Sequence, residues 1–168
     1  MDASIREACK YSLAAEVLQS TGELRFRASG ISMLPTLWPG DCLSIRAHSI
    51  EEVQQGDVVL YARGGRFFIH RIRRKCPSGE EILLITRGDC MAEEDPPVKK
   101  GDLLGKVIAI HRHGSRIMPR RNLSRLELLS AWLLCHWNLL LRAALWVYTD
   151  RAFGWLFLPP EKVEQLKG

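Results

Sequence analysis

Hydrophobic residues recur at two different spacings along the chain, and the change of spacing divides it into segments. In the first twenty residues the apolar side chains lie four positions apart, at Ile5, Cys9, Leu13 and Val17. This spacing places them on one face of an α-helix, which Thr21 and Gly22 can end. The sequence therefore predicts an amphipathic helix in residues 1–22, with the helix itself over residues 3–20.

From residue 23 the period falls to two, which is typical of strands with one buried face. Apolar residues alternate with arginines in "ELRFRASG", and short apolar runs follow at residues 42–47, 57–62, 66–72, 81–86 and 103–110. "RGGR" at 63–66 predicts a hairpin turn, and four Gly-Asp pairs predict turns beside the strands. Residues 23–112 are therefore predicted to form a mostly β domain, either a sandwich or a coiled barrel.

The character of the chain changes again near residue 112. Residues 111–125 hold five arginines and no acidic residue, so residues 113–125 are predicted to be a basic linker. Residues 126–168 are predicted to be an apolar helical tail. Its cleanest stretch, residues 128–141, is shorter than the roughly 20 residues of a bilayer span, whereas its tryptophans and basic edge are typical of interfacial helices. We expect the tail to lie on a membrane surface, with a membrane span or a partner-binding helix as alternatives.

Composition adds little to this division, but the cysteine count and spacing argue against a disulfide framework and a zinc-finger site. The chain has 168 residues, 46% of them hydrophobic, and a net charge of +5, which favours weak attraction to anionic surfaces. Its five cysteines include no Cys-x-x-Cys pair, so we predict reduced thiols and a cytosolic or cytosol-facing setting. The first residues lack the apolar core of a signal peptide.

Candidate chemistry begins in the stretch "ASGISMLPTLWPGD", residues 28–41, where the single hydroxyl of Ser32 lies in a stiff, apolar segment. A serine nucleophile needs a base and a site that holds the oxyanion. His70 lies in the apolar run "RFFIHRI", and Asp89 and Asp95 follow a strand in "TRGDCMAEEDPPV". These residues are compatible with a Ser-His-Asp set. They are equally compatible with a turn serine, a packed histidine and turn aspartates, because a triad is recognised in space.

Five blocks occur in an order that resembles the signal peptidase I family and its S24/S26-type serine peptidase relatives. They are "GISMLPTLWPGD", "GDVVLY", "FIHRI", "TRGD…EDPPV" and "LLGKV", and together they cover about residues 24–110. The resemblance implies a mostly β catalytic domain that hydrolyses peptide bonds through an acyl-enzyme. It also implies small residues in the substrate just before the cleaved bond. We expect no cofactor, and no metal, because the two histidines of "HRH" at 111–113 lack a third ligand.

The resemblance assigns roles residue by residue. Ser32 matches the nucleophile, and His70 falls where bacterial members carry a lysine base and the endoplasmic-reticulum and archaeal members carry histidine. Asp89 and Asp95 match the two acidic positions, of which we favour Asp95 as the partner of His70.

The surroundings of the nucleophile follow from the same resemblance. Gly30 stands where some bacterial members have a hydroxyl that helps to hold the oxyanion, so backbone donors, including the N–H of Ser32, would have to serve here. Met33 and Pro35 are expected to shape the nucleophile's turn and to line the site.

The chain departs from the family pattern in its apolar segment, which comes last and not before the serine. The arginines ahead of the tail favour a cytosolic catalytic domain and leave the substrate open. We therefore predict a membrane-associated serine endopeptidase that acts on a precursor or signal-type peptide, with a protein partner possible and no nucleic acid expected. The alternatives are a non-catalytic membrane or partner adaptor on a peptidase-like domain, and a self-cleaving repressor-type peptidase.

Overall fold

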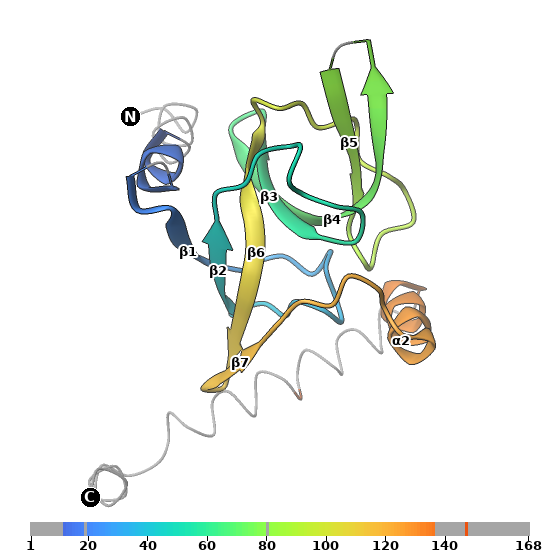
Figure 1. Cartoon of the computed structure of the whole chain (residues 1–168). Helices are drawn as coiled ribbons and strands as arrows, with labels where there is room; N and C mark the ends of the chain where they lie inside the picture. Colours follow the sequence, from blue (N-terminus) through green and yellow to red (C-terminus); the bar gives the residue numbers. More distant parts are fainter. Residues whose placement is uncertain (1–11, 19, 80, 137–146, 148–168) are drawn as a thin grey trace, which may run out of the picture. The chain divides into compact units, whose positions relative to one another are not determined.

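The described part of the chain is built on one antiparallel sheet. The computed structural model describes residues 12–18, 20–79, 81–136 and 147 (Figure 1). In these residues seven strands pair into the sheet: β1 (Glu23–Arg27), β2 (Cys42–Arg46), β3 (Val58–Arg63), β4 (Arg66–Ser78), β5 (Glu81–Arg87), β6 (Leu103–Arg112) and β7 (Ser115–Ile117). The prediction of a mostly β fold is confirmed. β4 continues to Ser78, beyond the predicted end at residue 72.

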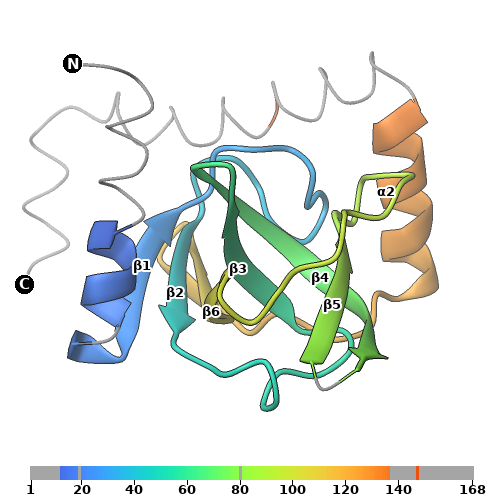
Figure 2. The same ribbon diagram turned by 90° about the horizontal axis from the view of Figure 1, so that it is seen from above.

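The sheet coils, so that strands far apart in the pairing order face one another. The order is β1-β2-β6-β3-β4-β5, and β7 pairs with β6. β1 and β4 are separated by β2, β6 and β3 in this order, yet Phe26 of β1 packs edge-to-face on Phe67 of β4, with ring centroids 5.5 Å apart. Figure 2 shows the same strands from above, with β2, β6 and β3 between β1 and β4. Of the two predicted architectures, the coiled one describes the structure.

A tight turn joins β3 to β4 and sets the register of the strands that flank it. Gly64 and Gly65 both have positive φ, 55° and 77°, as a two-residue type I′ hairpin requires. The turn pairs Arg63 with Arg66 and, further along the ladder, Val59 with His70. The predicted hairpin at "RGGR" is therefore confirmed, and it fixes which residue of β3 lies beside His70.

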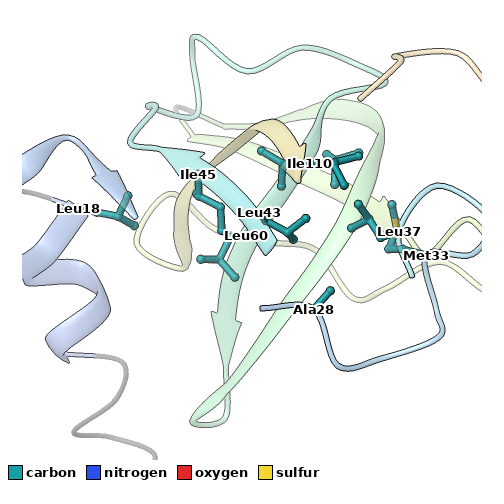
Figure 3. Close-up of a cluster of buried hydrophobic side chains, with 10 residues drawn as sticks. Leu18, Ala28, Met33, Leu37, Leu43, Ile45, Leu60 and Ile110 are labelled. Carbon is teal, nitrogen blue, oxygen red and sulfur yellow. The ribbon is translucent and has the colours of Figure 1, made fainter. Parts of the chain in front are cut away.

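β3 is buried on both faces because it separates two hydrophobic clusters. Its alternate residues Val58 and Leu60 belong to the first cluster, and Val59 and Tyr61 belong to the second. Figure 3 shows the first cluster, to which the turn after β1 contributes Met33 and Leu37. The segment that carries Ser32 is thus anchored in the main core of the domain.

The N-terminal segment is helical, but its buried face differs from the predicted one. Residues 12–18 and 20–21 are helical, while Ile5 and Cys9 lie outside the described residues. Leu13, which belongs to the predicted apolar face, is 59% exposed, whereas Ala14 and Leu18 are buried. The helix is rotated by about one position, because Leu18 packs into the first hydrophobic cluster.

The segment predicted as a linker takes part in the fold. Residues 113–125 contain β7, which pairs with β6, and Arg121 donates a hydrogen bond to Asp57. A reciprocal capping box between Ser124 and Glu127 starts helix α2, which spans Arg125–His136. Part of the predicted basic linker therefore pairs with the sheet, and Arg121 bonds to the turn before β3.

Of the predicted apolar tail, 126–168, only the part within α2 and residue 147 is described. No helix among the described residues is long and apolar enough to cross a membrane. The chain divides into two compact units, Met1–Trp132 and Leu133–Gly168, and the sheet belongs to the first.

A buried carboxylate ties the turn before β3 to two other segments. Asp57 accepts hydrogen bonds from Arg121 and from the backbone N–H of Gln54, and it forms an ion pair with Lys106. Burial raises the pKa of Asp57, but the bonds from Lys106, Gln54 and Arg121 outweigh it and hold the pKa below the ordinary value of 3.8. The carboxylate is therefore charged in the folded protein at neutral pH.

Replacing this carboxylate should weaken the fold in a pH-dependent way. We expect Asp57→Asn to lower the free energy of unfolding by about 1–3 kcal/mol at pH 7, because buried donors lose their charged acceptor. A lowered folded-state pKa contributes stability that is fully present above about pH 4 and is lost as the pH falls through the folded pKa. In urea unfolding, the difference between wild type and variant should therefore shrink below about pH 4.

The exposed ion pair between Glu23 and Arg46 provides the control, since its side chains are 50% and 54% exposed. Glu23→Gln should change the unfolding free energy by less than about 1 kcal/mol. Equal effects of the two substitutions at pH 7 would contradict the structural role of Asp57.

Candidate active site

Three of the predicted site residues meet where β4 passes the turn that follows β1. Ser32 lies in that turn, His70 lies in β4, and Asp95 lies in the loop after β5. His70 Nε2 lies 3.0 Å from Ser32 Oγ, and His70 Nδ1 lies 2.6 Å from Asp95 Oδ2. His70 is 6% exposed. The imidazole thus lies between a hydroxyl and a carboxylate and within hydrogen-bond distance of both.

The contacts of the carboxylate determine which nitrogen of His70 carries the proton. Burial raises the pKa of Asp95, but the hydrogen bonds from His70 and Thr86 outweigh it, so this pKa lies below its ordinary value. An ionised carboxylate only accepts hydrogen bonds, so Nδ1 of His70 donates to Asp95. In the neutral imidazole, Nε2 is then an acceptor for the hydroxyl of Ser32. In this arrangement an imidazole can take a serine proton while a carboxylate stabilises the resulting cation.

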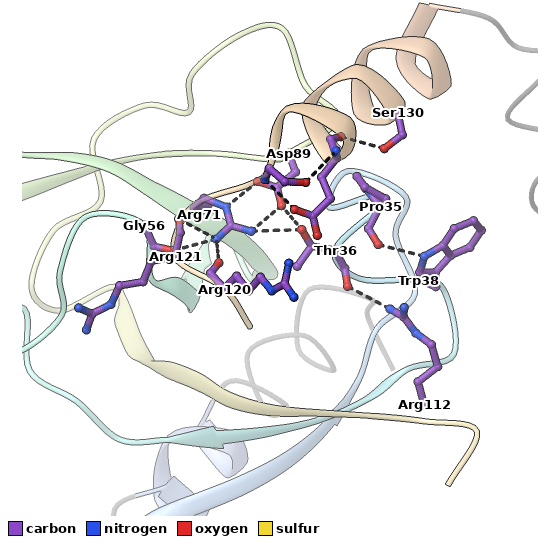
Figure 4. A network of polar contacts seen from close by, with 12 residues as sticks. Pro35, Thr36, Trp38, Gly56, Arg71, Asp89, Arg112, Arg120, Arg121 and Ser130 are labelled. Atoms are coloured by element: carbon purple, nitrogen blue, oxygen red, sulfur yellow. Dashed lines mark hydrogen bonds and ion pairs between the residues drawn. The ribbon is translucent and has the colours of Figure 1, made fainter. Parts of the chain in front are cut away.

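Asp89, the second acidic candidate, has a different partner. Both of its carboxylate oxygens accept hydrogen bonds from Arg71, and Oδ2 also accepts one from Thr36 (Figure 4). The side chains of Arg71 and Asp89 are 3% and 2% exposed. Arg71 also donates to the carbonyl of Gly56. This buried ion pair joins β4, the Ser32 turn and the loop after β5.

The loop that carries Asp89 also packs directly on the backbone of Ser32. The N–H of Cys90 donates to the carbonyl of Ser32 at 2.8 Å. A Cβ at Gly88 would lie 2.6 Å from that same oxygen and 2.7 Å from Cγ of Met91. Glycine is therefore the residue that permits this close approach, and the loop fixes the position of Ser32.

An open cavity of about 420 Å³ lies beside Ser32 and His70. Met33, which was expected to line the site, and Gly30 both line it. The other apolar parts of its wall come from both sides of the coiled sheet: Phe26, Ala28, Leu37, Phe67, Phe68 and Ile69. Pro35 instead lines a separate cavity of about 230 Å³. A Cβ at Gly30 would lie 4.0 Å from Ser32 Oγ, so the missing side chain leaves space beside that hydroxyl.

Several polar residues around these contacts were missed by the reasoning from sequence. Arg71 directly follows His70 and is 2% exposed. Thr86 and Tyr61 lie in apolar strands and are 0% and 1% exposed. A charged or hydroxyl side chain in an otherwise apolar strand was the available signal, since buried polar groups require partners.

The prediction of reduced thiols holds only in part. Cys42 and Cys76 are free thiols, whereas Cys90 is disulfide-bonded.

Comparison with known proteins shows the family of the chain. The model of the family described as Peptidase S24-like matches residues 3–108. The chain belongs to this family. The predicted resemblance to signal peptidase I-like peptidases is thereby confirmed, over a range that includes Ser32, His70 and Asp95.

Two curated proteins are similar to this S24-like chain. They are the signal peptidase complex catalytic subunit SEC11 of Colletotrichum graminicola and that of Pyricularia oryzae. Each is 30% identical over 89 residues, which is 46% of this chain and 52% of the relative. The chain thus spans about half the length of the curated relatives it matches.

A methyl group at Gly88 should disturb the support of Ser32. We expect Gly88→Ala to lower the free energy of unfolding by about 1–3 kcal/mol, because the added Cβ meets backbone that cannot retreat easily. Gly101 is the matched control, since a Cβ there would meet no atom within 4 Å. Gly101→Ala should change stability by less than about 0.5 kcal/mol in the same chemical denaturation experiment. Equal effects at the two glycines would refute the packing of this loop on Ser32.

Proposed function

We propose that this S24-like protein is a serine endopeptidase in which Ser32 is the nucleophile, His70 the base and Asp95 the partner of His70. The observation that carries the proposal is the position of the His70 imidazole, 3.0 Å from Ser32 Oγ and 2.6 Å from Asp95 Oδ2. Asp89 is given a structural role, because its carboxylate is occupied by Arg71 and Thr36.

The proposed reaction has two halves. In the first, Ser32 Oγ attacks the carbonyl carbon of the scissile peptide bond as its proton moves to Nε2 of His70. The imidazolium, stabilised by Asp95, then protonates the leaving amine, and the acyl-enzyme remains. In the second half, water gives a proton to His70 as its oxygen attacks the ester carbon. The bond from that carbon to Ser32 Oγ then breaks, and the imidazolium returns its proton to Oγ, which releases the acid product and regenerates the hydroxyl of Ser32.

The oxyanion of each half-reaction needs donors that are already in place. We assign the backbone N–H of Ser32 to this task, because Gly30 offers no side-chain donor. The support of the Ser32 carbonyl by Cys90 and the tight packing of Gly88 keep the peptide units of this turn in a fixed orientation. A rigid turn is what a backbone oxyanion site requires.

The cavity beside Ser32 supports a peptide substrate with apolar side chains near the cleaved bond. Its wall is largely apolar, and it opens directly next to Ser32 and His70. The curated relatives are named as catalytic subunits of a signal peptidase complex. We therefore propose a precursor or signal-type peptide as the substrate. Because the relatives are named as subunits of a complex, we also propose that this protein has a protein partner.

We further propose that the C-terminal segment associates with a membrane surface. In the described part of this segment, Leu126, Leu128 and Leu129 of α2 are 79%, 49% and 54% exposed. Arginines at 116, 120, 121 and 125 precede these side chains. Exposed apolar residues next to basic ones are typical of interfacial helices.

The catalytic proposal predicts the behaviour of a pair of serine variants. Ser32→Ala should abolish cleavage of precursor-derived peptides, with an unchanged melting temperature, because the nucleophile alone is lost. Ser29 lines the same cavity but does not contact His70 in the described structure, so Ser29→Ala should retain activity within a few-fold. Cleavage is measured by mass spectrometry of the products, using peptides with small residues before the cleaved bond.

Cleavage by Ser32→Ala at the wild-type rate would refute the nucleophile assignment. No cleavage by folded wild-type protein, alone or with membranes, would favour the non-catalytic adaptor.

Membrane association predicts that charge on α2 prevents binding to lipid. We expect the full chain to co-float with vesicles of phosphatidylcholine and phosphatidylserine, and Leu126→Asp with Leu129→Asp to lower the bound fraction at least about fivefold, since burying carboxylates in lipid is unfavourable. Leu13→Asp, at a side chain that is 59% exposed on the N-terminal helix, is the control and should bind as wild type does. Unchanged flotation of the double variant would contradict the role of α2.

A further inference from the structure

A buried polar cluster lies behind Asp95, on the side away from Ser32. Thr86 of β5 is 0% exposed and Tyr61 of β3 is 1% exposed. Thr86 Oγ1 donates to Asp95 Oδ2 at 2.8 Å, and the hydroxyl of Tyr61 lies 3.4 Å from Nδ1 of His70. Both hydroxyls are therefore next to the contact between Asp95 and His70, which the proposed reaction uses.

Thr86 holds Asp95 through two hydrogen bonds that run in opposite directions. The backbone N–H of Asp95 donates to the carbonyl of Thr86 at 2.8 Å, while the hydroxyl of Thr86 donates to the carboxylate. The same oxygen, Oδ2, is the one that faces Nδ1 of His70. The last residues of β5 thus fix both the main chain and the side chain of Asp95, although Asp95 itself lies in a loop.

Contacts on the ring of Tyr61 fix the position of its hydroxyl. Its ring stacks on Phe68 with centroids 5.5 Å apart and an interplanar angle of 16°, and the guanidinium of Arg63 lies over the ring. Arg63 also donates to the carbonyls of Pro96 and Pro97, which directly follow Asp95. β3 therefore restrains the loop of Asp95 from the side opposite to Thr86.

The protonation state of Tyr61 makes it a donor in this cluster. Burial raises the pKa of Tyr61 to about 12, and the neighbouring charge of Asp95 raises it as well. The hydroxyl therefore keeps its proton at neutral pH. Because Nδ1 of His70 already donates to Asp95, the acceptors beside this proton are the carboxylate of Asp95 and the hydroxyl oxygen of Thr86. Hydrogen bonds from His70, Thr86 and Tyr61 lower the pKa of Asp95, which favours the carboxylate as the acceptor.

We propose that Thr86 and Tyr61 are positioning residues for the proposed Ser-His-Asp set. Their hydroxyls donate to the carboxylate of Asp95, hold it ionised against Nδ1 of His70, and so fix the tautomer that leaves Nε2 free to accept the proton of Ser32. This inference rests on the proposed peptidase function for its kinetic consequences. The geometry that it claims exists with or without turnover.

Packing alone would be satisfied by apolar residues of the same shape at these two positions. Thr86 lies in the run "EILLITR", where a valine would fill the same volume without a polar atom, and burying an unpaired hydroxyl is unfavourable. Tyr61 lies in "VVLYA", where phenylalanine would preserve the stacking on Phe68. These isosteric residues therefore provide substitutions that remove the proposed function of each side chain and keep its shape.

The test compares Thr86→Val with Thr86→Ser in the full-length chain. Loss of a hydrogen bond to a charged group predicts a fall in kcat of about tenfold to a hundredfold for the valine variant, with KM for the peptide unchanged. The serine variant keeps the hydroxyl and should recover kcat to within a few-fold of wild type. Tyr61→Phe should lower kcat by a smaller factor, because the contact of its hydroxyl with Nδ1 of His70, at 3.4 Å, is longer than the 2.8 Å bond from Thr86 to Asp95.

A second readout does not depend on turnover. The proton on Nδ1 of His70 should give a strongly downfield NMR resonance, identified by its loss in His70→Ala. Thr86→Val should shift or broaden this resonance, and Thr86→Ser should restore it. A merely structural role for Thr86 predicts that kcat and resonance follow the melting temperature, whereas the positioning role predicts that they change in variants that melt as wild type does.

The outcomes separate the two proposals. An unchanged resonance and unchanged kcat in folded Thr86→Val and Tyr61→Phe, with Ser32-dependent cleavage by wild type, would overturn the positioning role and leave the peptidase function standing. Absence of Ser32-dependent cleavage would remove the peptidase function. A resonance that moves in Thr86→Val and returns in Thr86→Ser would then still support the hydrogen-bond geometry proposed for Asp95.

Discussion

The site depends on the alternation of side chains along β4, which sends two neighbouring residues to opposite faces of the sheet. His70 faces Ser32 and Asp95, whereas Arg71 is buried on the other face against Asp89. A buried guanidinium is tolerated only when its donors are satisfied. Arg71 meets that condition with Asp89, Thr36 and backbone carbonyls. One strand therefore supplies both the candidate base and the ion pair that holds the surrounding loops.

The coiled sheet turns this local arrangement into a site. Hydrogen bonds from Arg71 reach the Ser32 turn at Thr36 and the loop of Asp89, and the same loop packs on Ser32 through Gly88. Because β1 curves round to face β4, the open cavity forms next to the serine. The site thus lies on loops, while its geometry is set by strands and by a buried ion pair.

Much of the fold was predictable from sequence, because the relevant signals are local. The period of two, the Gly-Gly turn and the order of five blocks led to the β domain and to Ser32 and His70. The partner of His70 was harder, since Asp89 and Asp95 lie in one loop and only three-dimensional contacts separate the carboxylate bound by Arg71 from that bound by His70. The exposed Leu13 shows the same limit, because a helical period does not fix its phase against a core.

Thr86 and Tyr61 could not be found from periodicity, because each occupies a position that an apolar residue would fill equally well. The hydroxyl of Thr86 contacts Asp95, which lies in a loop after β5, and the hydroxyl of Tyr61 lies beside His70 of the neighbouring strand. Long-range polar contacts of this kind leave almost no trace in a single sequence, apart from an unexpected hydroxyl in an apolar strand.

The central claim is that His70 activates Ser32, and the most direct test is the site and rate of covalent labelling by a serine-directed acylating probe. The adduct is mapped by mass spectrometry of peptides from the full-length protein. The account predicts an adduct on Ser32 in wild type that does not form in folded His70→Ala. Labelling of Ser32 at the same rate in both proteins, or labelling of another residue alone, would contradict it.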